Sequence, residues 1–155
     1  MKKLQGFLII SFICLFLLGC TSTKEEKMVC SLNTNDVVNK YELNATYTVT
    51  YVGKIVKNVD NKEIVTSNEQ SILDYFENAL ETSYLTANET YGGYNYTVDR
   101  TSNTVTGAVK IDYTIMDLNK FVKDQPSLKS YVNSKNEMTI EGLKSLYTTL
   151  GATCK

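Results

Sequence analysis

The stretch from Tyr41 to Tyr51 alternates between two kinds of side chain, and this alternation restricts the fold more than any other feature. Along this stretch Glu42, Asn44, Thr46, Thr48 and Thr50 alternate with Tyr41, Leu43, Ala45, Tyr47, Val49 and Tyr51. A period of two places successive side chains on opposite faces of a β-strand, so the segment is predicted to have one buried and one wet face. The chain must therefore build a sheet that is covered on one side.

Further segments indicate partners for this strand. Gly53 breaks the first run, and residues 54–66 predict a second strand, with Asp60-Asn61-Lys62 interrupting its apolar groups. We expect antiparallel pairing through a short turn near Gly53. Residues 94–98 and 104–116 alternate in the same way on either side of Thr101-Ser102-Asn103, which predicts a second hairpin.

Two segments have helical spacing. Ser67 and Gln70 have the form of a capping box, and apolar residues follow at helical intervals until Asn88–Gly93 ends the element: Ile72, Leu73, Phe76, Ala79, Leu80 and Tyr84. Thr139 is a candidate N-cap for a second helix that stops at Gly151 and carries Ile140, Leu143, Leu146, Tyr147 and Leu150. Residues 117–124 and 128–132 suggest short helical segments.

The order strand, strand, helix, strand, strand, helix predicts an α+β fold. We expect an antiparallel sheet of about four strands with two main helices packed on one face. Residues 30–155 are enough for a single domain of this kind.

The first twenty residues have the pattern of an export signal. Lys2 and Lys3 precede an apolar run to Leu18, and Leu17-Leu18-Gly19-Cys20 resembles the lipobox of bacterial lipoproteins. The resemblance implies a signal peptide over residues 1–19, acylation of the Cys20 thiol, and a domain held on the extracytoplasmic side of a bacterial cell membrane. The alternative, an uncleaved anchor helix, needs about 20 apolar residues, and Phe7 to Leu18 is shorter.

Residues 20–29 would then form a lipidated flexible linker of small, polar and charged residues. Cys30 and Cys154 are the cysteines left after processing and acylation. A cysteine pair in an exported protein is typically oxidised, so we expect a Cys30–Cys154 disulfide, with two free thiols as the alternative.

The composition excludes several kinds of catalytic and binding site. The chain contains no histidine, which removes Ser-His and Cys-His nucleophile pairs and His-ligated zinc. Without residues 1–19 the chain has 14 basic and 17 acidic residues, so a basic footprint for nucleic acid is absent. Neither a phosphate-binding loop nor a metal-binding motif is present, and no cofactor or metal is expected.

Two local features suggest sites. Tyr91, Tyr94 and Tyr96 flank Gly92-Gly93, and tyrosines around a mobile backbone can bind a sugar or a peptide. The alternative is a loop that leads into a strand. Asp99 and Asp112 lie on neighbouring predicted strands and are the carboxylates that a hydrolase would need, although acids on a wet sheet face are usually solvated.

The whole mature chain, together with the lipobox, resembles the small bacterial lipoproteins of the YehR type, a family of unknown function. The likeness lies in the lipobox, the Tyr47–Val56 hairpin, and the sequences Met28-Val29-Cys30, Ile111-Asp112-Tyr113 and Gly151-Ala152-Thr153-Cys154. The resemblance implies a lipid-anchored α+β domain and carries no known active site.

These observations predict a non-enzymatic binding or accessory domain at the membrane surface. Cys20 would hold it to the membrane, and its partner would be an envelope protein or a small ligand. The alternatives are a carboxylate-dependent cell-envelope hydrolase and a purely structural envelope protein. A hydrolase needs acids that converge in a cleft with shifted pKa values, whereas a binding domain needs an exposed apolar or aromatic patch.

Overall fold

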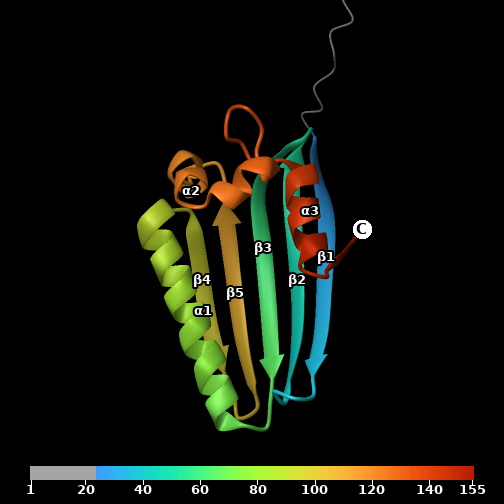
Figure 1. The fold of residues 1–155 in the computed structure, drawn as a ribbon, viewed down its shortest axis with the longest axis vertical. Coiled ribbons are helices and arrows are strands. Elements are labelled where there is room, and N and C mark those ends of the chain that lie inside the picture. Colours follow the sequence, from blue (N-terminus) through green and yellow to red (C-terminus); the bar gives the residue numbers. More distant parts are fainter. Residues whose placement is uncertain (1–23) are drawn as a thin grey trace, which may run out of the picture.

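A computed structural model describes residues 24–155 as one antiparallel sheet with helices on one face (Figure 1). Within these residues the sheet has six strands in the order β4-β5-β3-β2-β1-β6, so the expectation of about four strands was wrong. Cys20 and the predicted signal peptide lie outside the described residues. The strands are β1 (Glu25–Asp36), β2 (Tyr41–Val52), β3 (Ile55–Thr66), β4 (Tyr94–Arg100), β5 (Thr104–Asp112) and β6 (Thr153–Cys154).

Strands β1 and β6 are the two that sequence reasoning did not assign. The predicted linker 20–29 extends too far, because residues 25–29 already belong to β1 and pair with β2. Polar residues dominate β1, and Met28, Cys30 and Leu32 alone mark its buried face. Its strand conformation is imposed by pairing with β2 along its whole length and with β6 at Cys30 and Ser31.

The two predicted hairpins are confirmed. Strands β2 and β3 are joined by the two-residue loop Gly53-Lys54, whose glycine has φ 60°, a left-handed conformation that glycine adopts without strain. Strand β3 continues through Asp60-Asn61-Lys62, which the sequence suggested as an interruption. Strands β4 and β5 pair across residues 101–103, and β5 then pairs with β3 to join the hairpins into one sheet.

Helix α1 (Gln70–Tyr91) covers β4 and β5. The predicted capping box is wrong, because the N-cap is Glu69 and the cap has no side-chain hydrogen bond. Ser67 instead donates its hydroxyl to the Lys40 carbonyl (2.7 Å) and accepts from the Glu69 N–H (3.1 Å), which joins the turn before α1 to the β1–β2 loop. The helix approaches β5 closely at Gly107, where a Cβ would lie 3.1 Å from Leu80.

The C-terminal third forms α2 (Leu118–Asp124), the 3₁₀ helix η1 (Pro126–Tyr131) and α3 (Ile140–Thr149). Thr139 caps α3 as predicted, accepting the Gly142 N–H at 3.1 Å. The segment before α3 is fixed to the sheet, since Val56 donates its N–H to the Met138 carbonyl and Ile140 donates to the Lys54 carbonyl, each at 3.0 Å.

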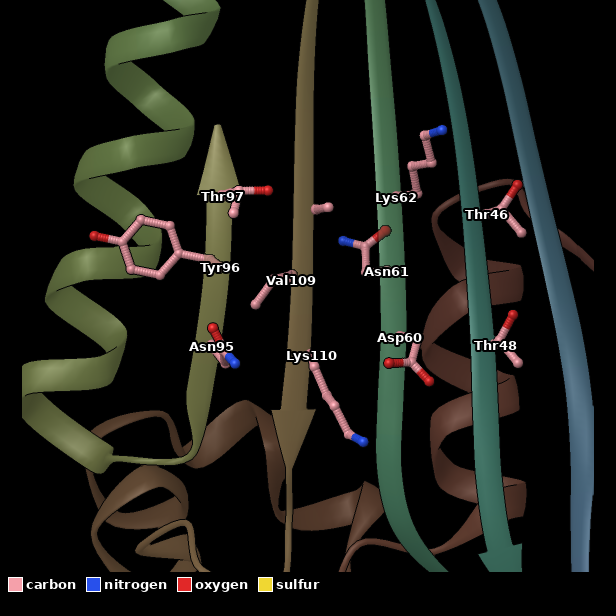
Figure 2. Close-up of a pocket in the computed structure, with 11 residues that line it drawn as sticks. Thr46, Thr48, Asp60, Asn61, Lys62, Asn95, Tyr96, Thr97, Val109 and Lys110 are labelled. Atoms are coloured by element: carbon pink, nitrogen blue, oxygen red, sulfur yellow. The ribbon is translucent and has the colours of Figure 1, made fainter. Parts of the chain in front are cut away.

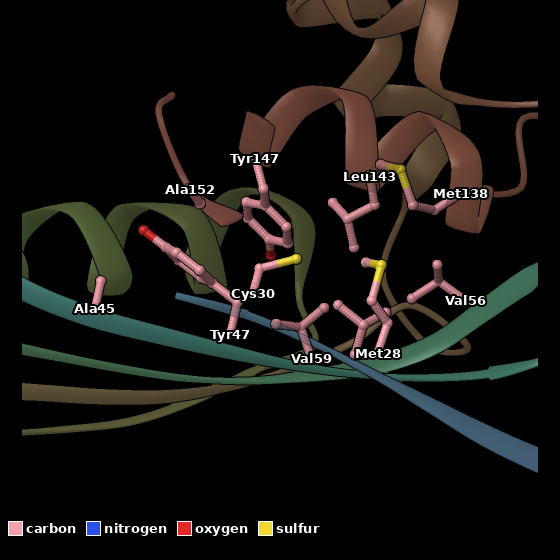
Figure 3. Packing of buried hydrophobic residues seen from close by; sticks show 11 residues of the cluster. Met28, Cys30, Ala45, Tyr47, Val56, Val59, Met138, Leu143, Tyr147 and Ala152 are labelled. Atoms are coloured by element: carbon pink, nitrogen blue, oxygen red, sulfur yellow. The ribbon is translucent and has the colours of Figure 1, made fainter. Parts of the chain in front are cut away.

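The main core lies between α3 and the buried faces of β1, β2 and β3 (Figure 3). Leu143 and Met138 are almost fully buried there, and the rings of Tyr47 and Tyr147 stack with centroids 4.3 Å apart. A second group of buried residues, including Leu73 and Val105, lies where α1 packs on the sheet. In residues 24–155 no helix is long and apolar enough to cross a membrane.

Cys30 and Cys154 meet as predicted, as opposed residues of β1 and β6 with their Sγ atoms at the 1.99 Å separation of a disulfide. Val29 and Lys155 exchange two backbone hydrogen bonds beside them. The bond links the first and last strands across 124 residues of chain.

We predict that a Cys30→Ala/Cys154→Ala double variant loses about 4 kcal/mol of unfolding free energy, because closing a loop of this length restricts the unfolded chain. Urea unfolding followed by circular dichroism measures the change. The wild-type protein in excess reductant serves as the control and should unfold at the same urea concentration as the variant. A variant with the midpoint of the oxidised wild type would contradict the prediction.

Candidate functional site

The face of the sheet opposite the helices is uncovered and polar (Figure 2). The register of the strands places side chains from β2, β3, β5 and β4 in rows across this face. One row reads Thr48, Asp60, Lys110 and Asn95, and the next reads Thr46, Lys62, Ala108 and Thr97. Neighbouring strands lie about 4.8 Å apart, so each row brings four side chains within reach of one small molecule.

These residues line a shallow groove of about 600 Å³, which we call the open-face groove. Its side chains offer hydroxyl groups from Thr46, Thr48 and Thr97 and an amide from Asn95. Its charged groups are the Asp60 carboxylate and the Lys62 and Lys110 ammonium groups. Such a surface can bind a polar ligand by hydrogen bonds and charge.

The three charged groups of the groove form no ion pair within 4.0 Å among residues 24–155. Asp60 and Lys110 are direct cross-strand partners, and Lys62 follows two residues after Asp60 on the same face. All three are exposed. They are therefore available to a ligand that carries charges of its own.

The predicted tyrosine site is divided by the fold. Tyr91 packs edge-on against Phe121 of α2, with centroids 5.0 Å apart, and lies beneath the Lys120 ammonium group. Tyr96 lies against Tyr84 of α1, with centroids 5.6 Å apart. Tyr94 is half-buried, and burial raises the pKa of its hydroxyl. The three rings pack against different neighbours, and their role in binding stays a prediction.

The two candidate carboxylates lie at opposite ends of the second hairpin. Asp99 faces Thr106, and Asp112 is six residues further along β5, a separation of about 20 Å at the rise of a strand. Hydrolase carboxylates work within about 10 Å of each other. Asp112 is occupied locally: its pKa is lowered by hydrogen bonds from the Thr114 hydroxyl and N–H, and more weakly by Lys110.

A polar cluster that sequence reasoning missed lies on the helix-covered face of β3. Asn61 donates its side-chain amide to Glu63 at 2.9 Å, and the Tyr84 hydroxyl donates to the same carboxylate at 3.4 Å. The Asn61 carbonyl oxygen is buried without a hydrogen-bond partner. The sequence did carry a signal for this cluster. Residues 60–62 interrupt the apolar pattern of the strand, and Asn61 there takes a position on the buried face that an apolar residue would otherwise occupy.

Among the described residues 24–155, no group of three or more His, Cys, Asp or Glu side chains is placed to hold a metal ion.

The comparisons with known proteins bear on the fold alone. No family model matches the chain, and no curated protein matches it significantly. The NMR structure of the Escherichia coli YehR protein is similar, with 16% identity and a TM-score of 0.53 over 84% of this chain and 91% of that one. An NMR structure of a protein from Streptococcus pneumoniae TIGR4 shares 13% identity, with a TM-score of 0.50 over 100% of this chain and 96% of that one. The resemblance to YehR is thus supported at the level of the fold.

We predict that stability falls as the pH rises from 10 towards 12. Burial, and more weakly the Glu63 charge, raises the pKa of Tyr47 from 10.0 to about 12. The same two causes raise the pKa of Tyr84. In this range the unfolded chain releases protons that the folded chain keeps, so the stability present below pH 10 is lost as the pH rises.

Urea unfolding at a series of alkaline pH values measures this loss. Tyr47→Phe should lose less stability over this range than the wild type, because it removes one of the groups responsible. Tyr75→Phe is the matched control, since Tyr75 is 67% exposed. Equal pH dependence in all three proteins would refute the assignment to Tyr47.

Proposed function

We propose that this chain is a lipid-anchored extracytoplasmic lipoprotein whose domain binds a polar ligand or envelope partner through the open-face groove, without catalysing a reaction. The observation that carries the binding role is the set of unpaired charges, Asp60, Lys62 and Lys110, on a rigid surface shared by four strands. Strand pairing already fixes the backbone positions of these residues, so binding has to order their side chains alone, at about 0.5–1.5 kcal/mol for each.

The chemistry of the groove indicates the class of ligand. Its floor has hydrogen-bonding groups, and the ring of Tyr96, which also lines the groove, lies against Tyr84 of α1, so stacking contributes little. Two ammonium groups beside one carboxylate favour a ligand with a carboxylate and an amine or amide close to it. A short peptide has these groups, and we propose a peptide segment, free or part of an envelope protein.

The proposed anchor agrees with where the fold begins. Strand β1 starts at Glu25, five residues after Cys20, which leaves at most about 18 Å of extended chain between the two. The acyl chains on Cys20 would hold the protein stably, because two or more chains are needed for a lasting anchor. The domain would then stay beside the membrane.

A hydrolase has less support. The Asp99 and Asp112 side chains that sequence reasoning singled out are too far apart to act on one bond. The binding role needs no such convergence.

Intact mass spectrometry of the protein extracted from its native membrane tests the anchor. We predict that the wild-type protein has the mass of residues 20–155 plus acyl chains. A Cys20→Ala variant should keep its signal peptide and carry no acyl chain. Cys30 and Cys154 should react with an alkylating agent only after the protein has been reduced. An unacylated wild-type chain would exclude the lipoprotein assignment.

Nuclear magnetic resonance tests the groove, with trialanine as a zwitterionic peptide probe and N-acetylglucosamine as a neutral sugar probe. We predict that trialanine shifts the amide signals of Thr48, Lys62 and Lys110. A Lys110→Ala variant should bind it about tenfold more weakly, since a charged hydrogen bond is lost. Lys155→Ala, outside the groove, is the matched control. Shifts confined to residues 91–94, or a response to the sugar alone, would refute a peptide site in the groove.

A further inference from the structure

The end of the domain at which β1 begins carries a basic cap. Residues 115–135, which include α2 and η1, lie at that end of the sheet (Figure 1), and we call them the proximal cap. The cap has four lysines, all exposed, against Asp117 and Asp124, and Glu25, Glu26, Glu137 and Glu141 lie beside it at the same end of the sheet. Its lysines are Lys120, Lys123, Lys129 and Lys135.

The two acids of the cap are engaged locally. Asp117 caps α2 by accepting the Lys120 N–H at 2.9 Å, and Asp124 pairs with the Lys120 ammonium group. Lys123 and Lys135 make no ion pair among the described residues. The side chain of Lys129 donates to the Asn136 side-chain oxygen at 2.6 Å, which leaves its charge uncompensated.

An exposed apolar side chain lies in the same cap. Ile115, in the turn between β5 and α2, is 71% exposed. Exposed basic groups and a protruding apolar side chain at the same end of a domain are a combination found on surfaces that touch a bilayer, where the apolar side chain enters the headgroup region.

The opposite end of the domain has the opposite charge. The end of β1, the start of β2, the turn before α1 and the first turns of α1 hold Asp36, Glu42, Glu69, Asp74 and Glu77. Lys40 and Arg100 are the basic residues there, and they pair with Glu69 and with Asp74 and Glu77. The lysines of the proximal cap and this acidic group therefore lie at opposite ends of the strands, with the acidic group remote from the start of β1.

We propose that the proximal cap docks on the anionic headgroups of the membrane and holds the strands steeply inclined to the bilayer. The inference rests on the proposed anchor at Cys20, which keeps the cap close to the headgroups. An anionic bilayer attracts the cap lysines and repels the acidic end, so charge favours the orientation with the cap towards the membrane. The attraction acts over about 10 Å at ordinary ionic strength and is weakened by salt.

The rate at which lysines are acetylated in vesicles tests the proposal. The protein used is the acylated product, residues 20–155. The protein is placed in vesicles of phosphatidylcholine, with or without phosphatidylglycerol, and its lysines are acetylated and identified by mass spectrometry. We expect Lys123, Lys129 and Lys135 to react about fivefold more slowly when phosphatidylglycerol is present. Lys40 and Lys62, outside the cap, should react equally in both, and high salt should remove the difference.

Charge-reversal variants provide the matched comparison. Lys123→Glu/Lys135→Glu should abolish the protection of Lys129, whereas Lys40→Glu/Lys62→Glu should retain it. Equal rates at Lys129 in the two kinds of vesicle, or protection at Lys40 in place of the cap, would overturn the proposal.

The anchor and the cap can fail separately. If the intact mass shows no acyl chain, the proposed function fails, and the same acetylation is performed on the chain mixed with phosphatidylglycerol vesicles. Protection of the three cap lysines would still support docking by charge, and its absence would overturn it.

Discussion

Burial of one face of the sheet beneath α1 and α3 is the interaction on which the other features depend. In an antiparallel sheet covered on one side, every strand must direct its apolar residues to the same face. Val49, Val59, Val65, Val105 and Val109 all meet this requirement. The opposite face is then free to carry polar side chains, and the open-face groove is a direct result.

The helices were predictable in type because their stabilising signals are local. The Thr139 cap and the apolar spacing of α3 lie within a dozen residues, and the structure confirms both. The two hairpins were predictable for the same reason, since alternation and turn residues are contiguous in the chain. The N-terminus of α1 was misplaced because Ser67 forms its hydrogen bond with Lys40, a residue far away in the sequence.

Strand β1 and the groove depend on contacts that a single segment does not encode. The buried residues of β1 are too few to reveal a strand, and pairing with β2 and β6 makes it one. Alternation placed Thr46 and Thr48 on the wet face correctly, yet it did not show that β3 lies between β2 and β5. That pairing is what brings Asp60 and Lys62 between the threonines and Lys110.

The proposed anchor and the position of the groove together determine the direction from which a ligand would approach. Asp60 lies five residues from the start of β3, about 16 Å from the end of the sheet at which the proximal cap lies. The groove opens on the uncovered face of the sheet, alongside the strands. With the strands steep to the bilayer, the groove would face sideways rather than towards the membrane. A ligand would then approach along the membrane surface, at a height suited to the extracytoplasmic part of a neighbouring envelope protein.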